Sequence, residues 1–269
     1  GALKERILTD QQDNYTPFLI IGTAGSVSTG CVDPLQELAK IAKTYNLWFH
    51  IDGAYGGLGS ALPEFAQIFE GLGLADSIAV DPHKWMYATL VAACVLVKDA
   101  RYLTDTFSYH PPYYNFEASA LNYMDYGPQN SRGFQALKVW LSCQHLGTSG
   151  YRQLIREDIR LARYASELFA TLDDFEVLSQ HLSITTFRYH PQAQVKETEN
   201  NPSDHMLNTW NQAILSQVER GGVYFLSNAI LQDTFALRLC IVNFRTTKAD
   251  IEELPSYLRA LAQSVRPDQ

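Results

Sequence analysis

Two charged residues, Asp52 and Lys84, each closely follow a short apolar run that is typical of a buried strand. Lys84 stands between His83 and Trp85, so we expect its amine to be partly removed from water. Partial desolvation favours the neutral form of a lysine, and a neutral amine can attack an aldehyde. A carboxylate at the neighbouring strand end could hold a proton on a ring nitrogen of a bound cofactor. Spacing alone leaves a plainer interpretation open, in which Asp52 caps a turn and Lys84 is a surface residue.

The turn that follows Asp52 is built from small residues: Gly53, Ala54, Gly56 and Gly57. Glycine has no side chain beyond Cα, so other groups can approach its backbone closely. We therefore expect this turn to leave room for a flat ring beside Asp52.

Short apolar runs alternate with a helical pattern in the first part of the chain. We expect strands at 18–24, 46–52, 77–80 and 90–97. Asp33 and Pro34 predict the start of a helix, with Asp33 as the N-cap and Pro34 at the first helical position. This alternation predicts an α/β domain with a mainly parallel sheet. Such sheets bind ligands beyond the carboxyl ends of their strands, where Asp52 and Lys84 lie.

The rest of the chain divides into a loop, two helices and a second unit. Residues 107–129 have no clear period, and we expect a functional or disordered loop there. Long helices are predicted at 132–145 and 151–172. An α+β unit follows, with strands near 175–179, 182–190, 223–227 and 235–242 and helices near 203–220 and 247–264. We divide the chain into a large domain (1–145), a connecting helix (146–172) and a small domain (173–269).

Composition excludes several classes of protein. The net charge of −8 argues against a nucleic-acid partner. The longest strongly apolar stretch, 90–97, is too short to cross a bilayer, and the first residues lack the apolar core of a signal peptide. The 4 cysteines have no metal-binding spacing, so we expect mostly buried, reduced thiols in a cytoplasmic protein and no metal site.

Two motifs give these residues a context: HIDGAYGG at 50–57 and DPHKWM at 81–86. Both resemble signature segments of the group II pyridoxal-phosphate decarboxylases, a family that includes the aromatic L-amino-acid and glutamate decarboxylases. GTAGSVSTGCVDPL before the first motif and LRLCIVNFRTTKADIEEL near the C-terminus are also similar to that family. The resemblance implies the C-terminal portion of a fold type I (aminotransferase-like) large domain with a small α+β domain. It also implies pyridoxal 5′-phosphate as the cofactor.

The resemblance implies roles for the residues around Lys84. Lys84 would hold the cofactor as a Schiff base, and Asp52 would pair with its pyridine nitrogen. Ala54 would pack on the face of the ring. His83 would contact the cofactor and the region of the substrate carboxylate. Asp81 lies near the phosphate position, where a carboxylate cannot donate a hydrogen bond, so its expected role is to order the turn.

Two further positions follow from the same resemblance. Ser28 or Val27 falls where some members place a threonine beside the ring hydroxyl, and Ser28 is the better candidate because valine cannot form that bond. The mobile catalytic loop of the family falls on 107–129. Its protonating tyrosine would be Tyr113, with Tyr114 as the next choice.

The expected activity is decarboxylation of an L-amino acid, most simply an aromatic one, to the amine and carbon dioxide. Two alternatives stay open: an aldehyde-forming oxidative decarboxylase-deaminase, and a non-catalytic homologue or half-subunit. The tyrosine at 113 argues against the first alternative, because some aldehyde-forming members of the family have phenylalanine there.

Family members have a preceding half of the large domain that supplies most of the phosphate site, and no segment of this sequence matches it. We therefore expect a cleaved or separately encoded N-terminal half to complete the sheet, since the sheet alone would expose an apolar edge and face. The completed unit would form a two-fold dimer, as in group II enzymes, with contacts near 90–93 and 107–129.

Overall fold

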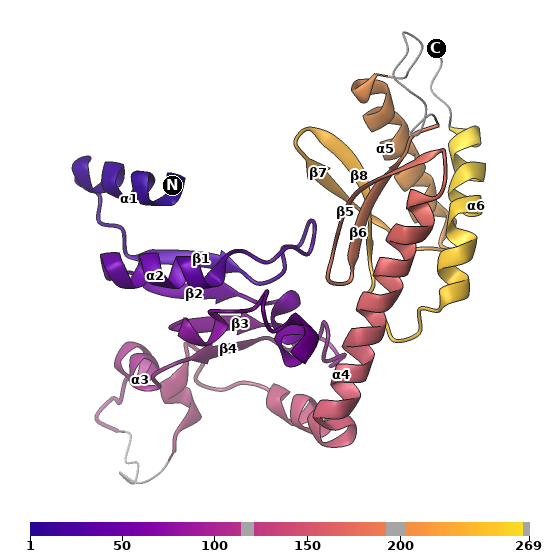
Figure 1. The fold of residues 1–269 in the computed structure, drawn as a ribbon. Coiled ribbons are helices and arrows are strands. Elements are labelled where there is room, and N and C mark those ends of the chain that lie inside the picture. Colours follow the sequence, from indigo (N-terminus) through magenta and orange to yellow (C-terminus); the bar gives the residue numbers. More distant parts are fainter. Residues whose placement is uncertain (114–120, 192–202, 266–269) are drawn as a thin grey trace.

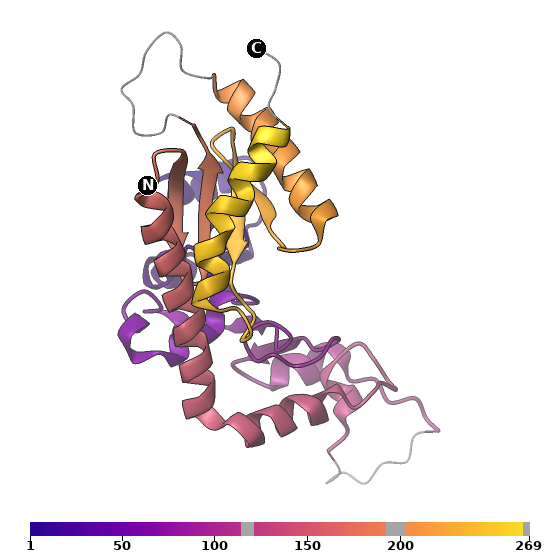
Figure 2. The ribbon, with the colours of Figure 1, turned by 90° about the vertical axis from the view of Figure 1, so that its right-hand side faces the viewer.

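The computed structural model describes residues 1–113, 121–191 and 203–265. They form two lobes, each built around a sheet, and the long helix α4 (Gln135–Ala170) runs from one lobe to the other (Figures 1 and 2). The expected α/β architecture is therefore confirmed.

The first sheet contains the strand that ends at Asp52 and the strand that precedes Lys84. Its strands lie in the order β1 (Leu19–Thr23), β2 (Trp48–Asp52), β3 (Ser77–Val80) and β4 (Cys94–Val97). β1, β2 and β3 are parallel, whereas β4 is antiparallel to β3. The strand predicted at 90–97 is thus shorter than expected. Two helices flank the strands, α1 (Ala2–Gln12) and α3 (Arg101–Phe107), and 3-10 turns occupy Gly56–Ala61, Pro63–Phe65, Leu72–Leu74 and Tyr123–Tyr126.

Helix α2 (Leu35–Tyr45) connects β1 to β2 and covers one face of this sheet (Figure 1). Its N-cap is Pro34 and its first residue is Leu35, so the predictions that Asp33 caps the helix and that Pro34 is its first helical residue are wrong. The carboxylate of Asp33 instead accepts a hydrogen bond of 2.8 Å from the backbone N–H of Thr23. The helix ends at Asn46, whose φ of 52° is left-handed and stops the helix.

The opposite face of the sheet is largely uncovered. Leu19, Ile21 and Val95 are 38%, 58% and 55% exposed. Strand register puts these side chains on the same face as Asp52. The apolar face expected from the sequence is thus present.

Helix α4 combines the two helices predicted at 132–145 and 151–172. It is kinked at Gly147, where φ is 61° and the backbone is not helical. Its C-terminal part packs on the second sheet.

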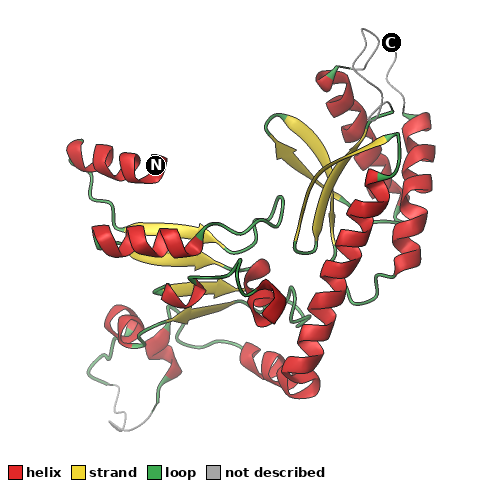
Figure 3. Ribbon diagram, viewed as in Figure 1, coloured by secondary structure: helices red, strands yellow, loops and turns green. Residues whose placement is uncertain are grey.

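The second sheet is antiparallel and forms the second lobe. Its strands lie in the order β5 (Phe175–His181), β6 (Ile184–Tyr189), β8 (Thr234–Cys240) and β7 (Ser227–Leu231). Helices α4, α5 (Asp204–Gly221) and α6 (Lys248–Ser264) pack together along it (Figures 1 and 3). Their buried side chains form a core with Phe169, Phe187 and Leu237.

The strand predicted at 223–227 is wrong, because β7 begins only at Ser227. Gln232 and Asp233 have φ angles of 47° and 69°, which is typical of a tight two-residue hairpin turn. This turn pairs Leu231 with Thr234 and sets the register of the two strands. The apolar run 223–226 therefore lies before the strand.

The 4 cysteines are free thiols, but the expectation that most are buried is wrong: Cys94 is exposed and the others are half-buried. Within the described residues, none of the helices has the length and apolar character needed to span a membrane. The division into domains at 145 and 172 stays a prediction.

Candidate active site

The segments that follow β2 and β3 lie side by side. Asp52, the last residue of β2, pairs with Ala79 of β3. Beyond the strands, the N–H of Gly53 donates to the carbonyl of Ala79 at 3.0 Å, and the N–H of Asp81 donates to the carbonyl of Ala54 at 3.2 Å. The parallel sheet thus brings together the segments that carry Asp52 and Lys84.

The carboxylate of Asp52 is fixed by its own turn. The backbone N–H of Ala54 donates to its Oδ1 atom at 3.1 Å. Asp52 is otherwise exposed at the end of the strand. One carboxylate oxygen is therefore oriented while the side chain stays accessible to a ligand.

Lys84 lies in a tight turn with Asp81. Its Nζ atom is 3.0 Å from Oδ2 of Asp81, and its backbone N–H donates to the carbonyl of Asp81 at 3.0 Å. The side chains of the lysine and the aspartate are 34% and 23% exposed. The amine of Lys84 is thus partly desolvated, as expected, and has an anionic partner that sequence reasoning missed.

His83 is fixed by a backbone contact. Its Nδ1 atom lies 2.7 Å from the carbonyl oxygen of Ala92. A carbonyl can only accept, so Nδ1 carries the proton and donates. In the neutral ring Nε2 is then the acceptor, and it lies 3.8 Å from Oδ2 of Asp81.

Ser28 lies in the turn after β1, and the first residue of this turn, Ala24, contacts Asp52. The N–H of Ala24 donates to the carbonyl of Asp52 at 2.7 Å, which joins the two turns. Ser28 is half-buried, whereas Val27 is 73% exposed. Of these two residues, Ser28 is thus the less exposed.

The small residues after Asp52 were expected to leave room for a flat ring, but protein atoms occupy part of that space. A Cβ atom on Gly56 would lie 2.4 Å from the carbonyl oxygen of Ala24 and 2.8 Å from Cδ1 of Leu182. Ala24 and Leu182 therefore fill the space beside Gly56, which leaves no room for a cofactor ring there. A Cβ atom on Gly57 would meet only Val80, at 4.0 Å, so space remains there.

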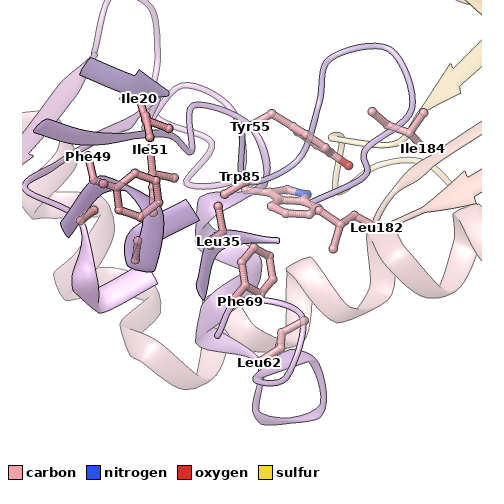
Figure 4. Close-up of a cluster of buried hydrophobic side chains, with 14 of the residues drawn as sticks. Ile20, Leu35, Phe49, Ile51, Tyr55, Leu62, Phe69, Trp85, Leu182 and Ile184 are labelled. Carbon is pink, nitrogen blue, oxygen red and sulfur yellow. The ribbon is translucent and has the colours of Figure 1, made fainter. Parts of the chain in front are cut away.

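The second lobe reaches this site through the hairpin between β5 and β6. The hydroxyl of Tyr55 lies 2.7 Å from Oγ of Ser183 and accepts from the N–H of Ser183 at 3.0 Å. Figure 4 shows Leu182 and Ile184 beside the rings of Tyr55 and Trp85. The core of the first lobe thus includes side chains from the second.

A buried carboxylate on α4 contacts the residues just after Lys84. Oδ2 of Asp158 accepts hydrogen bonds from Nε1 of Trp85 at 3.0 Å and from the hydroxyl of Tyr87 at 2.7 Å. Burial raises the pKa of Asp158 to about 6, against the lowering effect of these two hydrogen bonds. A signal was present in the sequence, since Asp158 interrupts the apolar stripe of Ile155, Ile159 and Ala162.

Cys240 of β8 is close enough to Lys84 and to Arg238 for their charges to act on its thiol. Burial raises the pKa of the Cys240 thiol, whereas the positive charges of Arg238 and Lys84 both act to lower it. Nη1 of Arg238 donates to Oγ of Ser227 at 2.9 Å. Its Nε atom is buried without a hydrogen-bond partner in the described part of the chain. No local pattern in the sequence signals this approach, because it depends on how the second lobe is placed.

Tyr113 follows a helix that lies at the other end of the sheet. The antiparallel strand β4 carries the chain back from the Lys84 end to α3. There the ring of Tyr102 contacts Trp48, the first residue of β2, with ring centroids 5.0 Å apart. Tyr113 is 77% exposed, and Tyr114 lies outside the described residues.

Comparisons with known proteins identify the family and the fold of this chain. Residues 1–190 match the pyridoxal-dependent decarboxylase conserved domain. An aromatic-L-amino-acid decarboxylase from Bacillus atrophaeus is 33% identical over 98% of this chain and 55% of that protein. The 4-hydroxyphenylacetaldehyde synthase of Rhodiola rosea is 27% identical with a TM-score of 0.85, covering 99% of this chain and 54% of that one. The Oryza sativa TDC solved with PLP and tryptamine shares the fold, with 23% identity and a TM-score of 0.90 over 98% of this chain and 54% of that one.

These neighbours confirm the expected fold type I architecture. The chain spans about half the length of the relatives that it matches. It belongs to the pyridoxal-dependent decarboxylase family.

Proposed function

We propose that the protein containing this chain decarboxylates an L-amino acid, most simply an aromatic one, with pyridoxal 5′-phosphate as its cofactor. The observation that carries the proposal is the hydrogen bond between the Asp81 N–H and the Ala54 carbonyl. It joins the segments of Asp52 and Lys84, so an amine and a carboxylate lie at the adjacent ends of two parallel strands. These are the groups that such a cofactor requires. The similarity to an aromatic-L-amino-acid decarboxylase supports the same substrate class.

When bound, the cofactor supplies an electron-withdrawing ring that accepts the electron pair released as carbon dioxide leaves. Lys84 would attach the cofactor through its amine, and Asp52 would hold a proton on the ring nitrogen. Ala54 would pack against the ring, and Ser28 would bond to the ring hydroxyl. The fixed Oδ1 atom of Asp52 supports this role, because it restricts the carboxylate to one orientation.

Three further residues would orient the substrate and the lysine. His83 would contact the cofactor and the substrate carboxylate through Nε2, since the proton on Nδ1 is donated to a carbonyl. Nε2 can donate to a carboxylate only when the ring carries both protons. Asp81 would order the turn through its backbone hydrogen bonds to Ala54 and Lys84, and its side chain would pair with Lys84 before the cofactor binds. Arg238 is a second candidate for the substrate carboxylate, because its buried Nε atom has no hydrogen-bond partner among the described residues.

Tyr113 would act in the active site of a partner subunit. Its role is to give a proton to Cα after carbon dioxide leaves. Lys84 lies beyond the carboxyl end of β3, whereas α3, which precedes Tyr113, contacts the first residue of β2. A two-fold dimer, with contacts at 90–93 and 107–129, would bring Tyr113 of one subunit to Lys84 of the other.

The uncovered face of the first sheet would be covered by the N-terminal half of the enzyme. This half would come from a cleaved or separately encoded polypeptide, or from an earlier part of a longer natural chain. The exposed side chains of Leu19, Ile21 and Val95 support the proposal, since such apolar faces are usually buried. The phosphate site would lie mostly in that half. The 4 free thiols support a cytoplasmic location.

The test uses the native protein that contains this chain. Reduction with borohydride should link the cofactor to Lys84, as mapped by mass spectrometry of the digested protein. Lys84→Ala should abolish both the link and turnover, and Lys98→Ala serves as the control because Lys98 is exposed beyond β4. Full turnover in Lys84→Ala would overturn the proposal.

An aldehyde-forming reaction is the second candidate, favoured by the similarity to the Rhodiola rosea 4-hydroxyphenylacetaldehyde synthase. Product analysis separates the two reactions: decarboxylation alone gives the amine and carbon dioxide, whereas the alternative consumes molecular oxygen and water and gives the aldehyde, ammonia, carbon dioxide and hydrogen peroxide. A protein that binds no cofactor and turns over no amino acid would instead be a non-catalytic homologue.

A further inference from the structure

The residues that follow Lys84 are bonded to the buried carboxylate of Asp158. Trp85 is 0% exposed and Asp158 is 2% exposed. Nε1 of Trp85 and the hydroxyl of Tyr87 both donate to the same oxygen, Oδ2 of Asp158. Burying a carboxylate is unfavourable unless hydrogen bonds compensate. Because an apolar side chain would fill this space without burying a carboxylate, we expect Asp158 to have a role beyond packing in the core.

Tyr87 links this carboxylate to the backbone of Lys84. Its φ is 52°, a left-handed conformation that costs a residue with a side chain about 1–2 kcal/mol. In this conformation the Tyr87 N–H donates to the carbonyl of Lys84 at 2.9 Å. The hydrogen bond to Asp158 therefore stabilises a strained turn that closes onto the lysine.

Helix α4 holds the same turn at a second point. Tyr151, two helical turns before Asp158, donates from its hydroxyl to the carbonyl of Met86 at 3.2 Å. Tyr87 also packs edge-on against Phe244 of the second lobe, with ring centroids 5.5 Å apart. The turn is thus fixed from α4 and from the second lobe.

We propose that Asp158 is a positioning residue for Lys84. It acts through Trp85 and Tyr87 and fixes the turn that aims the lysine amine at the end of the sheet. The proposal rests on the proposed role of Lys84, although the effect of Asp158 on the turn can be measured without any cofactor. Asp158 itself takes no part in bond making.

The shared acceptor oxygen allows a sharp choice of variants. Asp158→Asn keeps one oxygen that can accept from both donors, since a carbonyl oxygen has two lone pairs. Asp158→Leu has a similar size but no acceptor. Arg156→Gln is the matched control on the same helix, because it removes an exposed ion pair with Glu64 that does not involve the turn.

Hydrogen exchange in the cofactor-free native protein tests the structural step. The amides of Tyr87 and Ala88 donate to the carbonyls of Lys84 and Pro82. In Asp158→Leu their exchange should be about tenfold faster or more, while the β2 amide of Ile51 keeps its wild-type rate. Asp158→Asn and Arg156→Gln should match the wild type at all these amides. Equal acceleration at Ile51 would mean a general loss of stability and would overturn the proposal.

Kinetics of the holoenzyme test the functional step. Asp158→Leu should lower kcat by about tenfold to a hundredfold with KM nearly unchanged, because a misplaced lysine slows turnover more than it weakens substrate binding. Asp158→Asn should restore kcat to within about threefold of the wild type. Tyr87→Phe should add little to Asp158→Leu, because both variants break the same hydrogen bond.

Two outcomes separate the possible failures. An unchanged kcat in Asp158→Leu with faster exchange in the turn would overturn the positioning role. Full activity of Lys84→Ala would instead overturn the proposed function, and the exchange result would still show whether Asp158 orders the turn.

Discussion

The amine of Lys84 lies 3.0 Å from the carboxylate of Asp81, three residues earlier in the same turn. Both side chains are partly exposed, so the ion pair contributes at most about 1 kcal/mol. The pair nevertheless occupies the amine that would attach the cofactor. It must break before the amine can attack an aldehyde.

The first prediction is that Asp81→Asn speeds the capture of pyridoxal 5′-phosphate by Lys84. The backbone bonds of Asp81 to Ala54 and Lys84 do not use its side chain, so the turn should survive. Losing an ion pair worth at most about 1 kcal/mol should raise the rate by up to about fivefold. Stopped-flow absorbance of the cofactor-free native protein measures the rate, with Asp105→Asn on α3 as the control. Slower capture would mean that the carboxylate is needed to order the turn.

The second prediction concerns the contact between the lobes at Tyr55. Tyr55→Phe removes the hydroxyl that accepts from the N–H of Ser183, a residue that is 0% exposed. A buried donor left without a partner costs about 1–3 kcal/mol. Urea unfolding of the native protein should show this loss. Tyr164→Phe is the control: it removes an exposed hydrogen bond to Glu252 and should cost about 0.5 kcal/mol or less. Equal losses in the two variants would argue against a special contribution of Tyr55.

The third prediction follows from the raised pKa of Asp158. Burial raises this pKa from 3.8 to about 6, so between these values the folded protein binds more protons than the unfolded chain. Stability must then fall as the pH rises through this window, by about 3 kcal/mol for this residue. The loss is complete only well above pH 6, and it is absent only well below pH 3.8. This is the reverse of the usual behaviour of a salt-bridged carboxylate.

Asp158→Asn should remove that pH dependence. The unfolding free energy of the variant minus that of the wild type should increase between about pH 4 and pH 7, because only the wild type loses stability as Asp158 ionises. All other titrating groups are shared, so the difference isolates Asp158. A difference that stays constant with pH would mean that Asp158 titrates near its ordinary pKa.

The ends of the strands in the first sheet could be predicted because they depend on a local pattern of apolar residues. Each strand is a continuous apolar run, and parallel neighbours end at the same edge, so Asp52 and Lys84 had to lie close together. The errors occurred where a different interaction decided the outcome. Asp33 bonds to Thr23 and not to the helix it precedes. The turn at Gln232 and Asp233 sets the start of β7, although 223–226 is more apolar.

The contacts of the site with α4 and the second lobe could not be predicted in this way. Asp158 meets Trp85 only because α4 packs against the turn of Lys84. Cys240 comes within range of the Lys84 charge only because the second sheet packs close to this site. Such contacts depend on how elements far apart in sequence pack. A charged residue within the apolar stripe of the helix indicated that Asp158 is unusual, but it did not predict Trp85 and Tyr87 as its partners.

The last prediction is that two variants, each unable to form the amine, restore amine formation in a mixed dimer. If Tyr113 serves the Lys84 of a partner subunit, a dimer of one Lys84→Ala and one Tyr113→Phe subunit keeps one site with both residues intact. If both residues of a site come from one subunit, each site of the mixed dimer lacks one of them. Equal co-expression gives mixed dimers as half of the population, so amine formation should return to about a quarter of the wild-type level. The control pairs Lys84→Ala with Asp52→Ala: both residues belong to one subunit, so this mixture should stay inactive. Restoration in the control alone, or in neither mixture, would contradict a site shared through Tyr113.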